Sequence, residues 1–177
     1  MFECFENLVN TRQSCREFND KPLDASVVEK IATLALKAPS ACNSQPWKMY
    51  LVTEPEKIKA VAESLQERGR NPFVSKAKAF VVVSERDATL FESAVQKFGK
   101  NHFVKYDIGE LVAYLTLGAQ SLGVSSCIIG WIEQEKLKKA VGMPEGEVSN
   151  IVVALGYSDI PVREKKRKDA VEVIKII

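Results

Sequence analysis

The chain has 177 residues, of which 46% are hydrophobic, and a formal net charge of +2 at pH 7. These values are typical of a single globular domain over residues 1–177, and the small charge gives no reason to expect a nucleic-acid or membrane partner. No apolar run approaches the roughly 20 residues of a membrane span and no secretory signal pattern opens the sequence, so we expect a cytoplasmic protein.

Hydrophobic periodicity predicts a mixture of helices and short strands. The expected helices cover residues 3–9, 24–38, 53–65, 90–98, 105–122 and 134–141. The expected strands cover residues 47–52, 79–84, 124–129, 150–155 and 171–177. Because helices and strands do not alternate strictly, the order predicts an α+β fold with three layers, α-β-α.

Several of these boundaries have a local physical cause. Asp24 is a suitable N-cap for the second helix, and Pro39 disfavours helical geometry in the residue before it. Thr53 and Glu56 have the spacing of a capping box for the third helix. Gly142 is suited to end the helix at residues 134–141.

The helix expected at residues 105–122 is apolar around much of its circumference, which favours a central position that reaches a subunit interface. Its small residues would allow another helix to approach closely: Gly109, Ala113, Gly118 and Ala119. The β-branched residues Val171–Ile177 predict a terminal strand.

The cysteines and the single histidine exclude several kinds of site. Cys4, Cys15, Cys42 and Cys127 are scattered and form no CxxC pair, so the sequence indicates no metal site and no disulfide framework. His102 stands in no recognisable motif, so we interpret it as a surface or packing residue. A hydrolase built on a catalytic histidine is therefore poorly supported.

The most informative segment is residues 38–47, Ala-Pro-Ser-Ala-Cys-Asn-Ser-Gln-Pro-Trp, between a predicted helix and a predicted strand. Two prolines stiffen this loop, and its hydroxyl and amide groups suit recognition of a flat heterocycle with a polar edge. A polar turn that leads into a strand is the alternative.

A second motif, Arg12-Gln13-Ser14-Cys15-Arg16-Glu17-Phe18, lies upstream. In an extended segment, Arg12, Ser14 and Arg16 line one side of the chain. Arginine binds phosphate well because its planar fork donates two hydrogen bonds at once. A solvated pair of surface arginines is the alternative.

Two further segments complete the pattern: residues 122–131, Leu-Gly-Val-Ser-Ser-Cys-Ile-Ile-Gly-Trp, and the basic tail at residues 163–168. Together and in this order, the four segments resemble the nitroreductase family of FMN-dependent oxidoreductases over nearly the whole chain. The resemblance implies a mostly antiparallel sheet flanked by helices. It also implies an intertwined homodimer in which each C-terminal strand joins the partner's sheet.

The resemblance also implies a role for particular residues around FMN. Arg12 and Ser14 would serve the phosphate end, together with Lys165 and Arg167 of the tail, and Gln13 between them would also bind the cofactor. Arg16 would reach the N1/O2 edge of the flavin. The loop that contacts the flavin of the other subunit would contribute Pro39, Ser40, Ala41, Asn43 and Gln45. The backbone of Ile128, Ile129 and Gly130 would lie along the ring near N5, whereas Lys166 and Lys168 would point away.

The implied activity is transfer of hydride from NADH or NADPH through flavin N5 to a small-molecule acceptor, with ping-pong kinetics and no catalytic acid or base. Acceptors would be nitroaromatics, quinones or enones, and their site would be open or roofed only by the segment around residues 98–106. Two alternatives remain open. One is another flavin task, such as flavin reduction or reductive dehalogenation. The other is a non-enzymatic binding dimer, which the low net charge disfavours.

Overall fold

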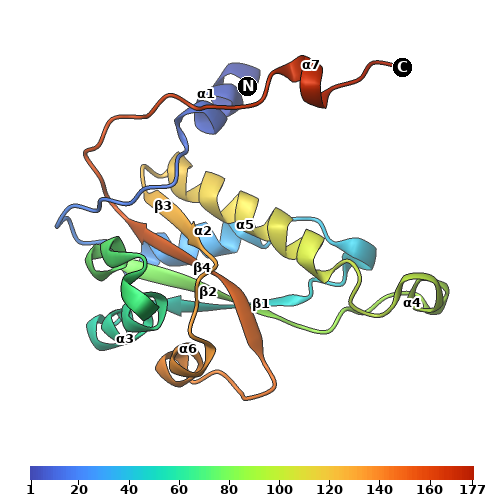
Figure 1. Ribbon diagram of the computed structural model, residues 1–177, viewed down its shortest axis with the longest axis horizontal. Coiled ribbons are helices and arrows are strands. Elements are labelled where there is room, and N and C mark those ends of the chain that lie inside the picture. The colour runs from blue at the N-terminus through green and yellow to red at the C-terminus, as the bar shows by residue number, and fades with distance from the viewer.

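Four strands form one antiparallel sheet in the computed structural model, which describes residues 1–177 (Figure 1). The strands lie side by side in the order β1 (Trp47–Val52), β2 (Ala79–Glu85), β4 (Val148–Gly156) and β3 (Ser125–Ile129). All four strands were predicted to within two residues at each end. The central strands β2 and β4 are apolar over most of their length because both of their faces are covered.

Helices cover both faces of this sheet. Helices α2 (Ala25–Ala35) and α5 (Val104–Ser121) share one apolar cluster with Val81 and Val83 of β2. Helices α3 (Pro55–Leu65) and α6 (Gln134–Val141) share the other cluster with Phe80 and Val82. Successive side chains of a strand point to opposite faces, so this one strand supplies both halves of the core.

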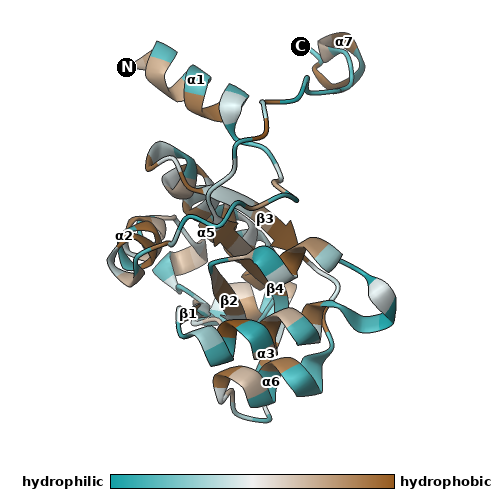
Figure 2. Cartoon of the chain, turned by 90° about the vertical axis from the view of Figure 1, so that its left-hand side faces the viewer, coloured by the Kyte–Doolittle hydropathy of each residue, from teal (hydrophilic) through white to brown (hydrophobic).

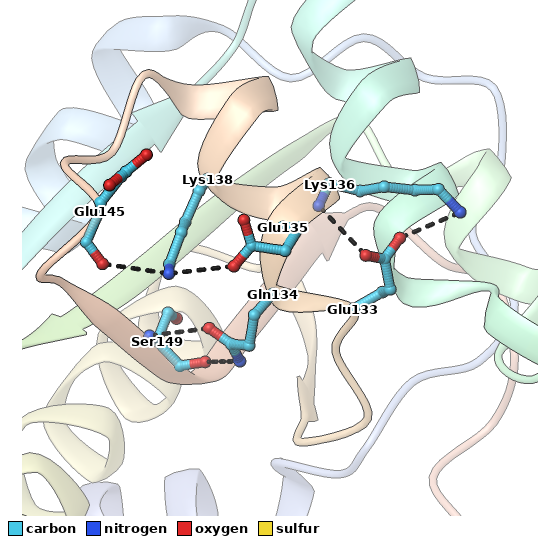
Figure 3. A network of polar contacts seen from close by, with 7 residues as sticks. All are labelled: Glu133, Gln134, Glu135, Lys136, Lys138, Glu145 and Ser149. Atoms are coloured by element: carbon cyan, nitrogen blue, oxygen red, sulfur yellow. Dashed lines mark hydrogen bonds and ion pairs between the residues drawn. The ribbon is translucent and has the colours of Figure 1, made fainter.

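Polar contacts fix α6 against the start of β4 (Figure 3). Glu133 caps the helix by accepting from the backbone N–H of Lys136, and its carboxylate also pairs with the Lys136 ammonium at 3.0 Å. Gln134 Nε2 donates to the Ser149 carbonyl at 2.7 Å. Gly142 ends the helix with a φ of 66°, as its sequence position predicted.

Two short elements lie outside the layers of the fold: α1 (Phe2–Thr11) and α7 (Ala170–Val173) (Figures 1 and 2). The end of α1 contacts the end of α5, where Gln120 donates a hydrogen bond to Thr11. Helix α1 has no buried residue, although Phe2, Phe5 and Val9 give it an apolar face. Helix α4 (Glu92–Phe98) projects at the other end of the molecule. The remaining helical turns are η1 (Ala41–Asn43), η2 (Glu67–Gly69) and η3 (Pro72–Lys76).

Two local predictions were wrong. The terminal strand expected over Val171–Ile177 is absent, because Asp169 caps a helical turn by accepting from the backbone N–H of Val171. The residues after that turn pair with no strand of the chain. The capping box was also wrong: Glu54 occupies the N-cap of α3 without a side-chain bond, and Pro55 begins the helix.

No helix of the chain combines the length and the hydrophobicity needed to cross a bilayer.

Candidate functional site

A basic cavity of about 320 Å³ lies where the segment after α1 meets the C-terminal tail. None of its lining residues is hydrophobic, and six of the nine carry a positive charge. The lining residues are Arg12, Gln13, Ser14, Arg16, Arg163, Glu164, Lys165, Lys166 and Arg167. The structure therefore brings together the two segments, about 150 residues apart in sequence, that were predicted to serve one phosphate.

Gln13 joins these two segments. Its Nε2 donates to the carbonyl of Pro161 at 3.1 Å, and its Oε1 accepts from the backbone N–H of Arg163 at 3.1 Å. The Arg163 guanidinium donates to the Ser14 carbonyl at 2.7 Å. Gln13 was predicted to contact the cofactor, but its amide is already used in holding the tail against the chain.

Positive charges crowd the cavity without enough acids to balance them. Burial lowers the pKa of Lys165, and the positive charges of Arg12 and Arg167 lower it further. The Lys165 ammonium donates to the carbonyls of Val9 and Asn10 at the end of α1. A cluster of cations held this closely favours a multiply charged anion, and its donor set fits a phosphate group.

The edge of β3 borders the same region. Ser14 forms an isolated parallel bridge with Ser126, and the backbone N–H of Cys15 donates to the Ser126 carbonyl at 2.8 Å. Backbone groups alternate in direction along an antiparallel strand, so those of Ile128 face the same open edge as those of Ser126. The side chain of Ile128 is 41% exposed, whereas that of Ile129 is buried.

Arg16 lies close to this edge. Burial raises the pKa of the buried Cys127 thiol, and the positive charge of Arg16 acts in the opposite direction. Arg16 is exposed and forms no salt bridge within the chain, so its guanidinium is available to a ligand bound beside β3.

The loop at residues 39–45 has an unusual backbone. Cys42, Asn43 and Gln45 have φ values of 53°, 51° and 49°, a region that residues other than glycine adopt infrequently. Ser40 Oγ accepts from the backbone N–H of Gln45 at 2.9 Å, and Gln45 Nε2 donates to the Asn43 carbonyl at 3.2 Å. The loop is therefore closed on itself by its own polar side chains.

This loop and the two segments that line the basic cavity lie at opposite ends of α5 (Figure 1). Near the start of α5, Asp107 accepts a hydrogen bond from the backbone N–H of Ala41; near its end, Gln120 donates to Thr11, next to the cavity. Asp107 and Gln120 are 13 positions apart in the helix, which is about 20 Å at a rise of 1.5 Å per residue. The predicted loop residues Pro39, Ser40, Ala41, Asn43 and Gln45 thus line no part of the basic cavity.

A larger polar cavity of about 830 Å³ opens beside the end of β2 and the start of β4. Asn101, His102 and Lys105, from the segment expected to border the acceptor, are among its lining residues. Its buried acid is Glu147, which accepts from Tyr50 at 2.8 Å and from Ser84 at 2.7 Å and pairs with Arg86 at 2.7 Å.

Sequence reasoning missed three residues of these sites. Arg163 and Lys166 line the basic cavity, although Lys166 was predicted to point away. Arg163 belongs to a run of six mostly basic residues, and nothing in the sequence distinguishes it from the others. Only its contact with Gln13 in the structure does so. Asp107 was missed because an acid in the first turn of a helix is common without any functional role.

Comparison with known proteins places this chain in a family. The model of the nitroreductase family matches residues 9–157. A protein of Archaeoglobus fulgidus provisionally named an NADH dehydrogenase/NAD(P)H nitroreductase is 31% identical over 161 residues, which are 89% of this chain and 86% of that protein. An iodotyrosine deiodinase of Haliscomenobacter hydrossis is 25% identical, with 96% and 88% of the two chains covered.

A solved structure described as an FMN-dependent nitroreductase from Clostridium difficile has a similar fold. Its TM-score is 0.70 at 22% identity, and 94% of this chain and 92% of that chain are covered. The match to the family model extends from the end of α1 through the last residues of β4, so it includes the first basic motif, the loop and the edge of β3. The chain therefore belongs to the nitroreductase family of oxidoreductases.

Proposed function

We propose that the protein is an FMN-dependent oxidoreductase that uses NADH or NADPH to reduce a small organic acceptor, such as a nitroaromatic, a quinone or an enone. The observation that supports this most is the basic cavity, in which two segments distant in sequence present six cations to one place. When bound, FMN would supply the hydride-transfer chemistry. The protein's own residues would bind and orient it.

In this proposal, the cavity holds the phosphate. Arg12 and Arg167 would donate charge-assisted hydrogen bonds from two sides, because their segments enter the cavity from opposite ends of the chain. Ser14 would add a neutral donor. Lys165 would contribute mainly charge, since its ammonium already donates to the carbonyls at the end of α1.

The flavin ring would lie along the free edge of β3. The backbone N–H of Ile128 faces this edge and would be available as a donor, while Ile129 ends the strand and Gly130 follows it. Arg16 would face the N1/O2 edge, where a fixed cation favours the negative charge of the reduced cofactor.

The same proposal requires two chains for each site, because within one chain the loop and the cavity are about 20 Å apart along α5. Packing α5 against its symmetry mate about a two-fold axis would bring the start of one helix to the end of the other. An exposed stripe of α5 suits this contact: Tyr106, Gly109, Glu110, Ala113 and Tyr114. A Cβ added to Gly109 would meet no atom within 4 Å, so this stripe is open in the single chain.

Exposed apolar residues at both ends of the chain also favour an intertwined homodimer. Phe2 of α1 is 74% exposed and Ile176 of the tail is 94% exposed. Burying such side chains against a second copy would be favourable by roughly 25 cal/mol per Å² of apolar surface. We propose that the partner provides this cover, within a three-layer α-β-α arrangement around the sheet.

Reductive dehalogenation is a second candidate, favoured by the similarity to the iodotyrosine deiodinase of Haliscomenobacter hydrossis. One experiment separates the candidates. The purified protein is titrated with FMN, and the holoprotein is then assayed with NADH or NADPH against nitroaromatic, quinone, enone and halophenol acceptors. Stoichiometric FMN binding with turnover of one of the first three classes supports the main proposal. Turnover of halophenols alone supports the second, and a failure to bind FMN contradicts both.

A further inference from the structure

Asp107 is a buried carboxylate that joins α5 to the loop at residues 39–45. Its side chain is only 5% exposed. Oδ1 accepts from the backbone N–H of Ala41 at 3.0 Å, and Oδ2 has no hydrogen-bond partner within the chain. The carboxylate forms no salt bridge, so the contact with Ala41 is its one bond to another part of the fold.

A carboxylate in this position is costly for a purely structural residue. Removing a charged group from water is unfavourable unless hydrogen bonds compensate, and here one of its two oxygens is left without any. Its place in the first turn of α5 offsets part of the cost, because the positive end of the helix dipole favours a negative charge. An apolar side chain could fill the same space without this cost, but it could not hold Ala41.

The loop needs such an anchor. Three of its residues occupy the left-handed region, and strained backbone of this kind persists only when its surroundings fix it. The bonds made by Ser40 and Gln45 close the loop on itself but do not attach it to the rest of the fold. Attachment comes from Asp107 on one side and, on the other, from Ser44 Oγ, which accepts from the backbone N–H of Thr89 at 2.6 Å.

We propose that Asp107 is a positioning residue for the flavin site of the partner chain: by holding the N–H of Ala41, it sets where Ser40 and Asn43 meet the cofactor. This role rests on the proposed function, in which the loop serves the second chain. Asp107 itself does not contact the flavin in this arrangement. It acts through the backbone of the loop, from the rigid start of α5.

Two substitutions of Asp107 test the role. Asp107→Ala removes the acceptor, whereas Asp107→Asn keeps a carbonyl oxygen in the same place. We expect the alanine variant to bind FMN about tenfold more weakly, and the asparagine variant to stay within about threefold of the parent protein. Affinity is measured from quenching of flavin fluorescence, and the thermal unfolding midpoint of each apoprotein is recorded beside it.

Glu147→Gln is the matched control, because Glu147 is another buried acid and its carboxylate accepts hydrogen bonds from Tyr50 and Ser84. It should lower the unfolding midpoint without changing the affinity for FMN. Equal FMN affinity in Asp107→Ala and the parent would overturn the positioning role, as would a loss of affinity that Asp107→Asn does not restore. Failure of the parent itself to bind FMN would instead contradict the proposed function.

Ala41→Pro tests the same hydrogen bond from the loop side. It replaces Asp107→Ala as the test if that variant does not fold. Proline lacks the N–H that Asp107 accepts, and the preceding Ser40 already has the extended geometry that proline requires of its neighbour, with φ −151° and ψ 156°. We expect a loss of about tenfold, and no further loss when Ala41→Pro is combined with Asp107→Ala. An unchanged affinity in Ala41→Pro, or full additivity in the double variant, would contradict the role.

Discussion

Arg12 and Arg167 enter the basic cavity from the two ends of the sequence, and the proposed phosphate contact depends on both. Replacing either with alanine removes a charge-assisted hydrogen bond, which should cost roughly 1.5–3 kcal/mol, or about 10- to 150-fold in the dissociation constant of FMN. Lys168→Ala is the control, because Lys168 belongs to the same basic run but does not line the cavity. Unchanged affinity in both arginine variants would refute the phosphate assignment.

Arg16 should act on the potential of the cofactor more than on its affinity. A cation beside the N1/O2 edge interacts more strongly with reduced, anionic flavin than with the neutral oxidised form. Arg16→Ala should therefore lower the reduction potential, by roughly 30 mV for each 1.4 kcal/mol of differential interaction lost. A redox titration measures this. Arg12→Ala should weaken the binding of oxidised and reduced FMN alike. If the flavin in Arg16→Ala has the same reduction potential as in the parent protein, Arg16 does not lie beside the N1/O2 edge.

Glu147 should make the stability of the fold depend on pH. Burial opposes ionisation, but the hydrogen bonds from Ser84 and Tyr50 and the charge of Arg86 outweigh it and hold the pKa of Glu147 below its ordinary value of 4.5. A carboxyl with a lowered pKa in the folded state stabilises the protein above pH 4.5, and this contribution is lost as the pH falls through the folded-state pKa.

Glu147→Gln should therefore reduce the free energy of unfolding by about 1–3 kcal/mol near neutral pH. Because glutamine does not titrate, the difference between parent and variant should shrink as the pH falls below 4.5. Urea denaturation at neutral and acidic pH measures both effects. A difference that stays constant with pH would show that Glu147 is not the titrating group.

At the scale of the elements, a substitution on α5 tests the proposed homodimer. Ala113 lies on its exposed stripe, and Ala113→Arg would place a long charged side chain where two copies of the helix are proposed to pack. The variant should be monomeric in analytical ultracentrifugation and should bind FMN weakly. Glu63→Arg, on the exposed side of α3 at the other face of the sheet, should leave the dimer intact. A parent protein that is monomeric would contradict the interface directly.

The elements also show where sequence reasoning succeeds. Strands such as Ala79–Glu85 are short apolar runs whose burial on both faces leaves few alternatives, and Gly142 ends α6 as expected. The tail is different: its β-branched residues favour a strand, but within one chain the cap supplied by Asp169 starts a helical turn instead. Propensity is overridden there because a strand needs a neighbouring strand to pair with, and the end of the tail lies away from the sheet of its own chain (Figure 1).

For the whole molecule, the sequence and the family resemblance predicted which residues are candidates and that the loop serves the other subunit, but not the distances and contacts that separate and hold these residues. The two basic segments were expected to meet, and they do. The separation of the loop from the cavity by the length of α5 is a property of packing, which no motif encodes. Likewise, neither the use of Gln13 to hold the tail nor the contact between Asp107 and Ala41 could be predicted, since each joins residues far apart in sequence.

The central claim is that two chains build each flavin site, and FMN stoichiometry in mixed dimers tests it most directly. Subunits carrying Arg12→Ala and subunits carrying Asn43→Ala, each with a different affinity tag, are combined, and doubly tagged dimers are isolated. If the cavity of one chain works with the loop of the other, each mixed dimer holds one intact site. It should then bind one FMN with the parent's affinity, although each variant homodimer binds FMN weakly at both sites. A mixed dimer with no high-affinity FMN would contradict the shared site, because both residues would then act within one chain.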